Sequence, residues 1–300
     1  MALGSATASM RTNAAPGGLV TALIFLPPAI LLFTLFVILP IGEAAWFGFY
    51  NWNGMGRLDE VIGLRNYIQV LNHSVFHRAF INNLLIIAVS LGLQLPLALA
   101  MAMLLADRFS GAVAFRMIFF LPYILADVAA GLIWRFMFDG DFGPLSYFIQ
   151  WLGYDAFHIL ADRDLAITTV LTVIVWKYFG FHMMLYIAGL QSIDRNLYEA
   201  ADIDGATAWQ RFRYVTIPQL GPMIRISVFF ALVGSLQVFD VIVPLTGGGP
   251  LNSTHTMVSY LYTFGVGRMR VGFGSAVGVI LFVICVFVAF GYKRWFMRND

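Results

Sequence analysis

Six long apolar segments, separated by shorter polar stretches, dominate the pattern of this sequence. Each is long enough to cross about 30 Å of hydrocarbon as a helix that rises about 1.5 Å per residue. The segments are Leu19–Pro40, Phe80–Leu105, Phe115–Phe138, Leu165–Leu190, Pro222–Val243 and Phe273–Phe296. The pattern predicts an all-α membrane protein with six transmembrane helices, and an even number of spans places both termini on the same side.

The composition agrees with this class of protein. Of the 300 residues, 60% are hydrophobic and 11% are charged, against about 45–50% and about 25% in soluble domains. A net charge of +2, spread thinly along the chain, does not predict a nucleic-acid partner. Cys285 is the single cysteine, so neither an intrachain disulfide nor a thiolate zinc site can form, and we predict no metal site.

The N-terminal residues differ from the rest of the chain. Residues 1–18 are rich in Ala, Ser, Thr and Gly, and their only basic residue is Arg11. They lack the basic start of a signal peptide and are too polar to pack. We therefore expect a disordered cytoplasmic tail at 1–18, followed by one membrane domain at 19–297.

The arrangement of positive charge predicts the orientation in the membrane. The side that would hold the termini carries ten Lys and Arg residues, and the opposite side carries six together with a group of five Asp residues between the third and fourth segments. Cytoplasmic loops of membrane proteins are enriched in Lys and Arg. Both termini are therefore predicted to be cytoplasmic.

A long polar loop, Gln191–Gly221, separates the fourth and fifth apolar segments. It predicts two short helices, because it holds two pairs of residues with the spacing of a capping box. These pairs are Asn196 with Glu199, and Thr207 with Gln210. Gly205 between the helices can adopt a positive φ and turn the chain, and Pro218 is expected to end the second helix.

The first of these helices combines small side chains with acidic ones. The small residues in and just after it are Ala200, Ala201 and Ala206, and the acidic residues are Glu199, Asp202 and Asp204. Small residues allow a neighbouring surface to approach the backbone closely. From the residues alone, the loop is either a docking element for a partner protein or a capped surface loop.

The same loop resembles the EAA loop, E-A-A-x3-G-x9-I-x-L-P, of the membrane subunits of ABC importers. The matching residues are Glu199-Ala200-Ala201, Gly205 and Val215-Thr216-Ile217-Pro218, with Val for Ile and Ile for Leu as the departures. Other segments resemble the carbohydrate branch of these permeases, of the maltose and glycerol-phosphate type. They are Phe25-Leu26-Pro27, Ile62-Gly63-Leu64-Arg65-Asn66-Tyr67, Leu121-Pro122-Tyr123, Ala188-Gly189-Leu190-Gln191-Ser192-Ile193, Phe239-Asp240 and Leu245-Thr246-Gly247-Gly248-Gly249-Pro250.

The resemblance implies an importer of the bacterial inner membrane that carries an oligosaccharide or sugar derivative. This chain would pair with a homologous second permease, two copies of a cytoplasmic ATPase and an external solute-binding protein. Its ATPase-coupling residues would be Glu199, Ala200, Ala201, Asp202, Gly205 and Ala206. No G-x4-G-K-[S/T] motif occurs in the chain, so we expect no enzymatic activity and no cofactor here, with ATP-Mg bound by the partner ATPases.

Asp127, Arg135, Lys177 and Asp240 lie inside the apolar segments, where charge is costly and often functional. Asp127 and Lys177 are calculated to share a depth and could pair, and Arg135 and Asp240 could form a second pair near the external side. Such pairs either neutralise each other and hold helices together, or line a translocation path.

Candidates for a sugar path combine aromatic faces with polar groups, because a pyranose face stacks on a ring while its hydroxyls take hydrogen bonds. They are Asp127, Trp176, Lys177, Tyr178, Gln237 and Asp240, with His182 as a further candidate that could instead bond a neighbouring helix. Gln237 and Asp240, three residues apart, are expected to share one helix face.

Two other classes of protein remain as alternatives. An intramembrane enzyme would use Asp127, His182 and Lys177 as acid–base groups, but the sequence has no H-E-x-x-H, G-x-S-x-G or paired-aspartate motif. A self-sufficient channel or secondary transporter would need inverted repeats or broken helices, and the sequence shows no matching halves.

Overall fold

A computed structural model describes residues 16–106, 109–155 and 158–296. Within these ranges the chain is helical, with one isolated β-bridge between Tyr50 and Val61. The first helix, α1, begins at Pro16, so residues 16–18 are helical and do not belong to the tail expected at 1–18. The remainder of that tail lies outside the described residues.

In the described part of the chain, four continuous helices are long and apolar enough to cross a membrane, and they overlap the first, second, fourth and sixth predicted spans. The first comprises α1 (Pro16–Phe33), a π-helical turn (Thr34–Ile38) and α2 (Leu39–Phe47). The second comprises α4 (Ser74–Val89), a π-helical turn (Ser90–Gln94) and α5 (Leu95–Leu105). The other two are α9 (Arg163–Gln191) and α16 (Val271–Phe296).

Prolines accompany three of the π-helical turns, though not the one at Leu261–Val266. Pro40, Pro96 and Pro218 each follow a π-helical turn by two residues. A proline has no N–H and its ring clashes with the carbonyl four residues earlier, and a wider turn relieves both problems without ending the helix. The helix Ala208–Gln219 ends one residue after Pro218, as expected from the sequence.

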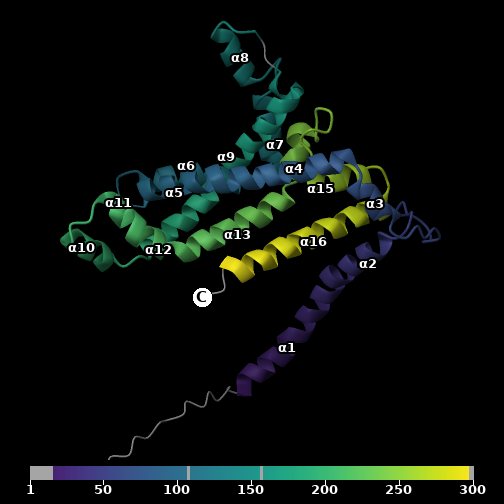
Figure 1. Ribbon diagram of the computed structural model, residues 1–300, viewed down its shortest axis with the longest axis horizontal. Coiled ribbons are helices and arrows are strands. Elements are labelled where there is room, and N and C mark those ends of the chain that lie inside the picture. The colour runs from purple at the N-terminus through teal and green to yellow at the C-terminus, as the bar shows by residue number, and fades with distance from the viewer. Residues whose placement is uncertain (1–15, 107–108, 156–157, 297–300) are drawn as a thin grey trace, which may run out of the picture.

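The third span is broken, contrary to the expectation of a continuous helix. It consists of α6 (Ala112–Ile124) and α7 (Asp127–Met137), whose axes differ by 98°. Leu125 and Ala126 between them are extended, with ψ angles of 141° and 137°. Figure 1 shows α7 leaving the bundle at this point, with α8 (Pro144–Trp151) on the same projecting arm. A short 3₁₀ turn, Ile159–Ala161, follows α8 in the sequence.

The fifth span is also irregular. It begins with a bend of 68° between the helix Ala208–Gln219 and α13 (Gly221–Gln237). If each of the two bent pairs counts as one span, the described residues hold six candidate membrane spans, and otherwise four. Helix α13 ends at Gln237, before the expected Val243, because Val238 leaves the helical region with a ψ of 120°. Three short segments follow it, namely α14 (Ile242–Thr246), α15 (Met257–Tyr260) and a π-helical turn at Leu261–Val266.

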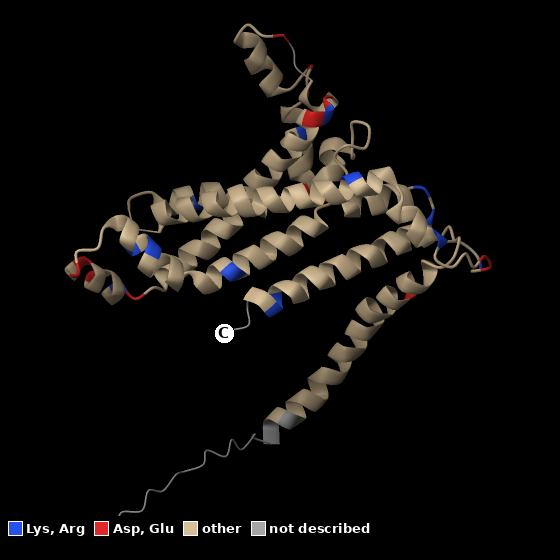
Figure 2. Cartoon of the chain, viewed as in Figure 1, with Lys and Arg blue, Asp and Glu red and all other residues tan. Residues whose placement is uncertain are grey.

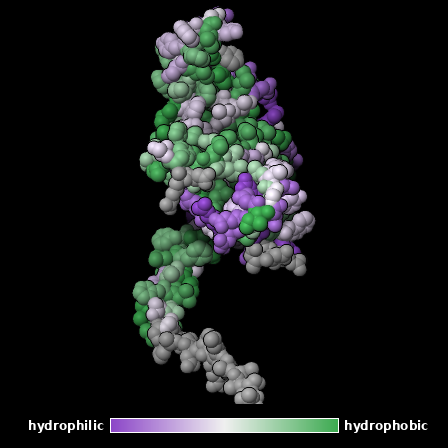
Figure 3. Space-filling model, turned by 90° about the vertical axis from the view of Figure 1, so that its left-hand side faces the viewer, coloured by the Kyte–Doolittle hydropathy of each residue, from purple (hydrophilic) through white to green (hydrophobic). Residues whose placement is uncertain are grey.

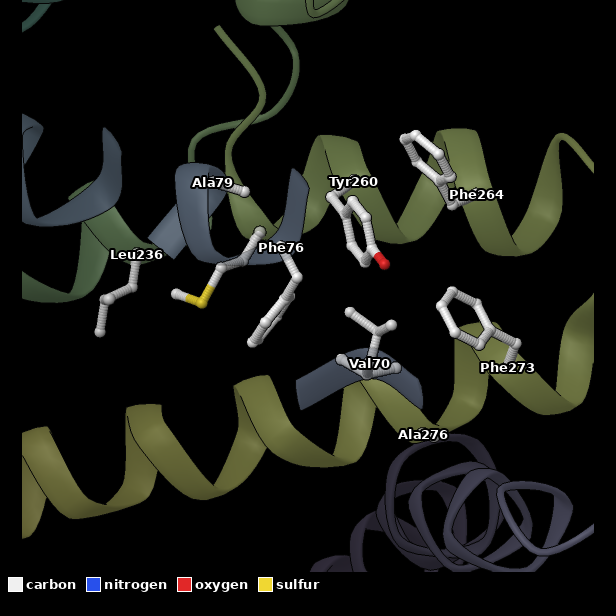
Figure 4. Close-up of a cluster of buried hydrophobic side chains, with 10 residues drawn as sticks. Val70, Phe76, Ala79, Leu236, Tyr260, Phe264, Phe273 and Ala276 are labelled. Carbon is white, nitrogen blue, oxygen red and sulfur yellow. The ribbon is translucent and has the colours of Figure 1, made fainter. Parts of the chain in front are cut away.

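The bundle packs through buried apolar side chains (Figure 4). One cluster joins α3 (Arg65–Leu71), α4, α13, α15 and α16, and it includes Val70, Phe76, Leu236, Tyr260 and Phe273. Helix α9 packs against both α5 and α6. Its contact with α6 is close because a Cβ at Gly180 would overlap the carbonyl of Phe119.

The two ends of the bundle differ in the elements they carry (Figure 1). One end holds α10 (Arg195–Ile203), α11 (Ala208–Arg211), a π-helical turn (Phe212–Thr216) and α12 (Ile217–Gln219), and the other holds α3 and α15. Figure 2 shows that charged residues gather at the ends and on the projecting arm, while the helices between them are nearly free of charge. Helix α1 extends away from the bundle, and α2 packs against α16.

Candidate functional site

A cavity of about 320 Å³ lies where the irregular segments of the bundle meet. It is enclosed by the π-helical turn between α4 and α5, the α6–α7 break, α9, and α13 with the chain that follows it. Its polar lining residues are Ser90, Gln94, Tyr123, Asp127, Tyr178, His182, Ser235, Gln237 and Asp240. Its apolar lining residues are Ile174, Phe181, Phe230, Ala231, Val238 and Phe239, and Gly234 completes the wall.

The break between α6 and α7 is filled by the side chain of Lys177. Its Nζ donates hydrogen bonds to the carbonyl oxygens of Pro122 at 3.0 Å, Tyr123 at 3.3 Å and Leu125 at 2.5 Å. The last carbonyls of a helix have no partner within the helix and carry partial negative charge. An ammonium group at the end of α6 therefore satisfies carbonyls that the break would otherwise leave buried and unpaired.

Asp127 occupies the opposite side of the same break, in the first turn of α7. Its Oδ1 lies 2.9 Å from Lys177 Nζ, and the hydroxyl of Tyr178 donates to its Oδ2 at 3.1 Å. A carboxylate is stabilised at a helix N-terminus as a cation is at a C-terminus. The predicted Asp127–Lys177 pair is thus confirmed, and it joins two half-helices to α9.

Lys177 and Asp127 differ in their access to the cavity. Lys177 is 1% exposed and is not among the lining residues, whereas Asp127 is 34% exposed and lines the cavity. Of these two path candidates, only Asp127 faces the open space. Trp176 also lies away from the cavity, because its ring packs edge-on against Trp134 with centroids 5.2 Å apart.

Gln237 and Asp240 both line the cavity, although the reason given for grouping them is wrong. Gln237 is the last residue of α13, and Asp240 lies beyond the end of the helix. They therefore do not share a helix face. Arg135 and Asp240 form no ion pair in the described part of the chain, so the expected second pair is not present.

His182 bonds a neighbouring helix, as one of the two predictions for it stated. Its Nδ1 lies 2.6 Å from Ser227 Oγ on α13, and its side chain is buried. The ring also forms part of the cavity wall. No carboxylate lies within ion-pair distance of His182 among the described residues.

Two buried asparagines on α4 were not singled out from the sequence. Asn83 donates to the carbonyl of Ser235 at 2.6 Å and accepts from the backbone N–H of Met257 at 2.9 Å. Asn82 donates to the carbonyls of Ser253 and His255, at 2.7 and 2.8 Å. These side chains hold the irregular chain that follows α13, and the adjacent pair of amides in an apolar segment was the available signal.

The polar loop at the other end of the bundle contains the two short helices predicted for it, α10 and α11. Helix α10 begins differently from the prediction, because its N-cap is Asp194, whose carboxylate accepts from the backbone N–H of Asn196 at 2.9 Å. The expected capping box of Asn196 is therefore wrong. Asp194, two residues earlier, accepts a backbone N–H at the start of the helix, and its negative charge is also favourable at a helix N-terminus.

The turn and the second helix of this loop follow the prediction. Gly205 has a φ of +72°, a region that glycine adopts without strain. Thr207 and Gln210 form a complete capping box at the start of α11. The hydroxyls of Tyr198 and Thr216 lie 3.0 Å apart and connect α10 to the π-helical turn after α11.

The loop exposes apolar side chains among charged ones. Ile203 is 87% exposed and Trp209 is 68% exposed. Around them, Asp202 pairs with Arg211 at 2.6 Å and Glu199 pairs with Arg195 at 3.4 Å, all on the surface. Figure 3 shows hydrophilic atoms gathered over this end of the bundle and interrupted by hydrophobic ones. Exposed apolar residues with a polar rim are typical of an interaction surface.

The chain matches known proteins over nearly its whole length. The family model described as "Binding-protein-dependent transport system inner membrane component" matches residues 1–299. The probable ABC transporter permease protein YurN of Bacillus subtilis is 32% identical over 277 residues, which cover 91% of this chain and 94% of that protein. The sulfoquinovosyl glycerol transport system permease protein SmoG of Agrobacterium fabrum is 31% identical and covers 95% and 92%.

A solved structure has the same fold. It is a chain of a bacterial ABC transporter involved in the import of the acidic polysaccharide alginate, with a TM-score of 0.81, 23% identity and coverage of 94% of this chain and 96% of that chain. Together, the family model and these relatives show that the chain belongs to the family of inner membrane components of binding-protein-dependent transport systems.

Proposed function

We propose that this chain is a permease subunit of an ATP-driven importer that carries an oligosaccharide or sugar derivative across a bacterial inner membrane. It forms the path with a homologous second permease and receives substrate from an external solute-binding protein. Two cytoplasmic ATPase subunits bind ATP-Mg and drive the cycle. The names of several relatives support a sugar-like substrate, among them trehalose/maltose, lactose and sn-glycerol-3-phosphate transport permeases.

The observation that carries this proposal is the surface formed by α10 and α11. Ile203 and Trp209 are exposed among charged side chains in this short loop, and an apolar surface with a polar rim favours coverage by a partner. The ATPase-coupling residues Glu199, Ala200, Ala201, Asp202, Gly205 and Ala206 lie in or directly after α10. We infer that the ATPase covers this surface.

The loop is built to transmit movement to the membrane helices. Its capping interactions satisfy backbone N–H groups at the starts of α10 and α11, and the Tyr198–Thr216 hydrogen bond connects α10 to the π-helical turn that leads into α12 and α13. When the ATPase subunits close around nucleotide, they would move this element and tilt α13. Because α13 forms one wall of the cavity, its movement would change access to the cavity.

The orientation follows from the same assignment. If ATPase subunits dock at α10 and α11, that end of the bundle is cytoplasmic, and the start of α1 and the end of α16 are cytoplasmic as well. The larger number of Lys and Arg residues predicted for that side agrees with this orientation.

Substitutions in the loop test the coupling. Gly205→Val places a β-branched residue at a φ of +72°, while Gly205→Asn is the matched control, because asparagine tolerates this conformation. We expect the valine variant, and also Glu199→Lys, to lose transport while the chain stays folded in the membrane. The measurements are copurification with the ATPase and the second permease, and uptake per ATP hydrolysed in proteoliposomes.

The outcome also separates the other classes of protein. Full uptake with normal ATP coupling in both Gly205→Val and Glu199→Lys contradicts the docking assignment. An intramembrane enzyme, a self-sufficient channel or a secondary transporter would be active as the purified chain alone. Activity without any ATPase partner therefore contradicts the proposed function.

A further inference from the structure

We propose that the cavity selects against negatively charged substrates, and that Asp240 is the residue that enforces this selection. The inference rests on the proposed function only in treating the cavity as part of a sugar path. It adds the charge of the substrate, which must be a neutral or amine-bearing carbohydrate.

The charges on the cavity wall support this selection. Among its lining residues are two carboxylates, Asp127 and Asp240, and neither Lys nor Arg. His182 is buried and has no carboxylate partner among the described residues. A buried side chain without such a partner is an unfavourable place for positive charge. The part of the wall that this chain contributes therefore has no cation that could receive a carboxylate, phosphate or sulfonate group.

The nearest basic residue is unavailable to a substrate. Lys177 is 1% exposed, and its ammonium group lies against the carbonyls of Pro122, Tyr123 and Leu125 as well as the Asp127 carboxylate. An ammonium group has three hydrogens to donate, and four oxygens already surround it here. Its charge is also balanced by Asp127, so this part of the wall is close to neutral.

Asp240 then determines the sign of the field in the cavity. Its side chain is exposed, and it forms no ion pair among the residues that the structure describes. A cleft with low-dielectric walls focuses the field of such a charge. A negatively charged solute is repelled there, and a hydroxyl or ammonium group can donate a hydrogen bond to the carboxylate.

The remaining lining groups suit an uncharged sugar. The amides of Gln94 and Gln237 both donate and accept, as sugar hydroxyls require, and the rings of Tyr123 and Phe230 offer apolar faces. Membership of the family does not decide the charge of the substrate, because relatives are named for sn-glycerol-3-phosphate and for lactose. The charges on this wall provide that information.

A cysteine reporter measures the sign of the field without knowledge of the natural substrate. Cys285, the single native cysteine, is replaced by Ser, and Gln237→Cys or Gly234→Cys is introduced in the wall of the assembled complex. The probes are a cationic (trimethylammonium) and an anionic (sulfonate) methanethiosulfonate, each forming a mixed disulfide with the thiolate and releasing methanesulfinate. The ratio of their rates is normalised to the ratio for 2-mercaptoethanol in solution.

We expect the cationic reagent to be favoured by about fivefold or more after normalisation. Asp240→Asn should remove most of this preference. The matched control is Asp141→Asn, which removes an exposed carboxylate that pairs with His158 outside the cavity and should leave the ratio unchanged. An equal ratio for both reagents, no response to Asp240→Asn, or no reaction at either cysteine each overturns the proposal.

The second measurement identifies the ligand. The cognate binding protein is screened against neutral, amine-bearing and acidic oligosaccharides, and uptake of the bound ligand by the reconstituted complex is measured. A transported neutral or amine-bearing sugar supports the charge selection, and a transported acidic sugar overturns it. If the cysteine ratio favours cations but no sugar is transported, the proposed function fails and the charge selection stands.

Discussion

Two ion pairs in this protein have similar lengths but different surroundings. Asp202 and Arg211, in the loop of α10 and α11, lie 2.6 Å apart, and their side chains are 54% and 36% exposed. Asp127 and Lys177, at the α6–α7 break, lie 2.9 Å apart, and their side chains are 34% and 1% exposed, so only the lysine is fully buried. Distance alone would rank the loop pair as the stronger. The burial of Lys177 reverses this order. Water screens the exposed loop pair, whereas water cannot replace the partner of a buried ammonium group.

The two regions also differ in how far apart their partners are in the sequence. In the loop, Asp194 caps a helix two residues away and Thr207 caps one three residues away. At the break, Lys177 bonds residues that precede it by more than 50 positions. We therefore expect substitutions in the loop to act locally, and substitutions at the break to affect the assembly of the whole bundle.

The largest effect is expected for Lys177→Met. The substitution removes the ammonium group, so that three carbonyls lose their hydrogen-bond donor and the Asp127 carboxylate loses its ion-pair partner. Removing one partner of a buried pair costs roughly 3–5 kcal/mol in soluble proteins. Thermal unfolding in detergent, followed by size-exclusion fluorescence, should show a large loss of folded protein.

The double variant Asp127→Asn with Lys177→Met is the control for this pair. It also removes the unpaired carboxylate, so it should be more stable than Lys177→Met alone. If the two single effects simply add, the residues are not coupled. Uptake by the double variant then distinguishes a purely structural pair, which predicts normal transport, from a pair that shapes the path.

The second effect concerns the asparagine that holds the chain after α13. Asn83→Ala would leave the carbonyl of Ser235 and the N–H of Met257 without their side-chain partner. An unsatisfied buried polar group costs about 1–3 kcal/mol. The same melting experiment should show this loss, and Asn72→Ala, at an exposed asparagine, is the matched control. Equal stability of the two variants would contradict the role given to Asn83.

A smaller effect is expected for the cap of α10. Asp194→Ala removes the side chain that accepts the N–H of Asn196, and losing such a cap costs about 1 kcal/mol. Asn196→Ala should have little effect, because its side chain caps nothing. Amide hydrogen exchange in Arg195–Ile203 measures the difference. Faster exchange in Asn196→Ala than in Asp194→Ala would show that Asn196 caps the helix, as expected from the sequence, and that Asp194 does not.

The smallest effect is expected for the exposed pair in the loop. Arg211→Ala should change the stability of the bundle by less than about 1 kcal/mol, since exposed ion pairs contribute about 0.2–1 kcal/mol. The melting temperature should therefore stay close to that of the unchanged chain. A loss as large as that of Lys177→Met would show that burial does not separate the two pairs.

Much of the site could be predicted from local sequence. The positive φ of Gly205 and the capping box of Thr207 follow from residue types a few positions apart. The Asp127–Lys177 pair could be predicted from depth, because two opposite charges in apolar segments must find partners. Gln237 and Asp240 both line the cavity, but the prediction that they share a helix face is wrong, because it assumed that α13 continues past Val238.

The sequence by itself determined the class of the protein, the approximate positions of the apolar segments and, in the polar loop, the turn at Gly205 and the capping box of α11. Hydropathy and capping act over a few residues or one span, so they can be seen in the chain. Only the tertiary structure decided where the third and fifth spans break and which polar groups face the cavity. An interrupted helix is stable in a membrane only if other segments satisfy its backbone groups. Here those partners, Lys177 for α6 and Asn83 for the chain after α13, come from other helices.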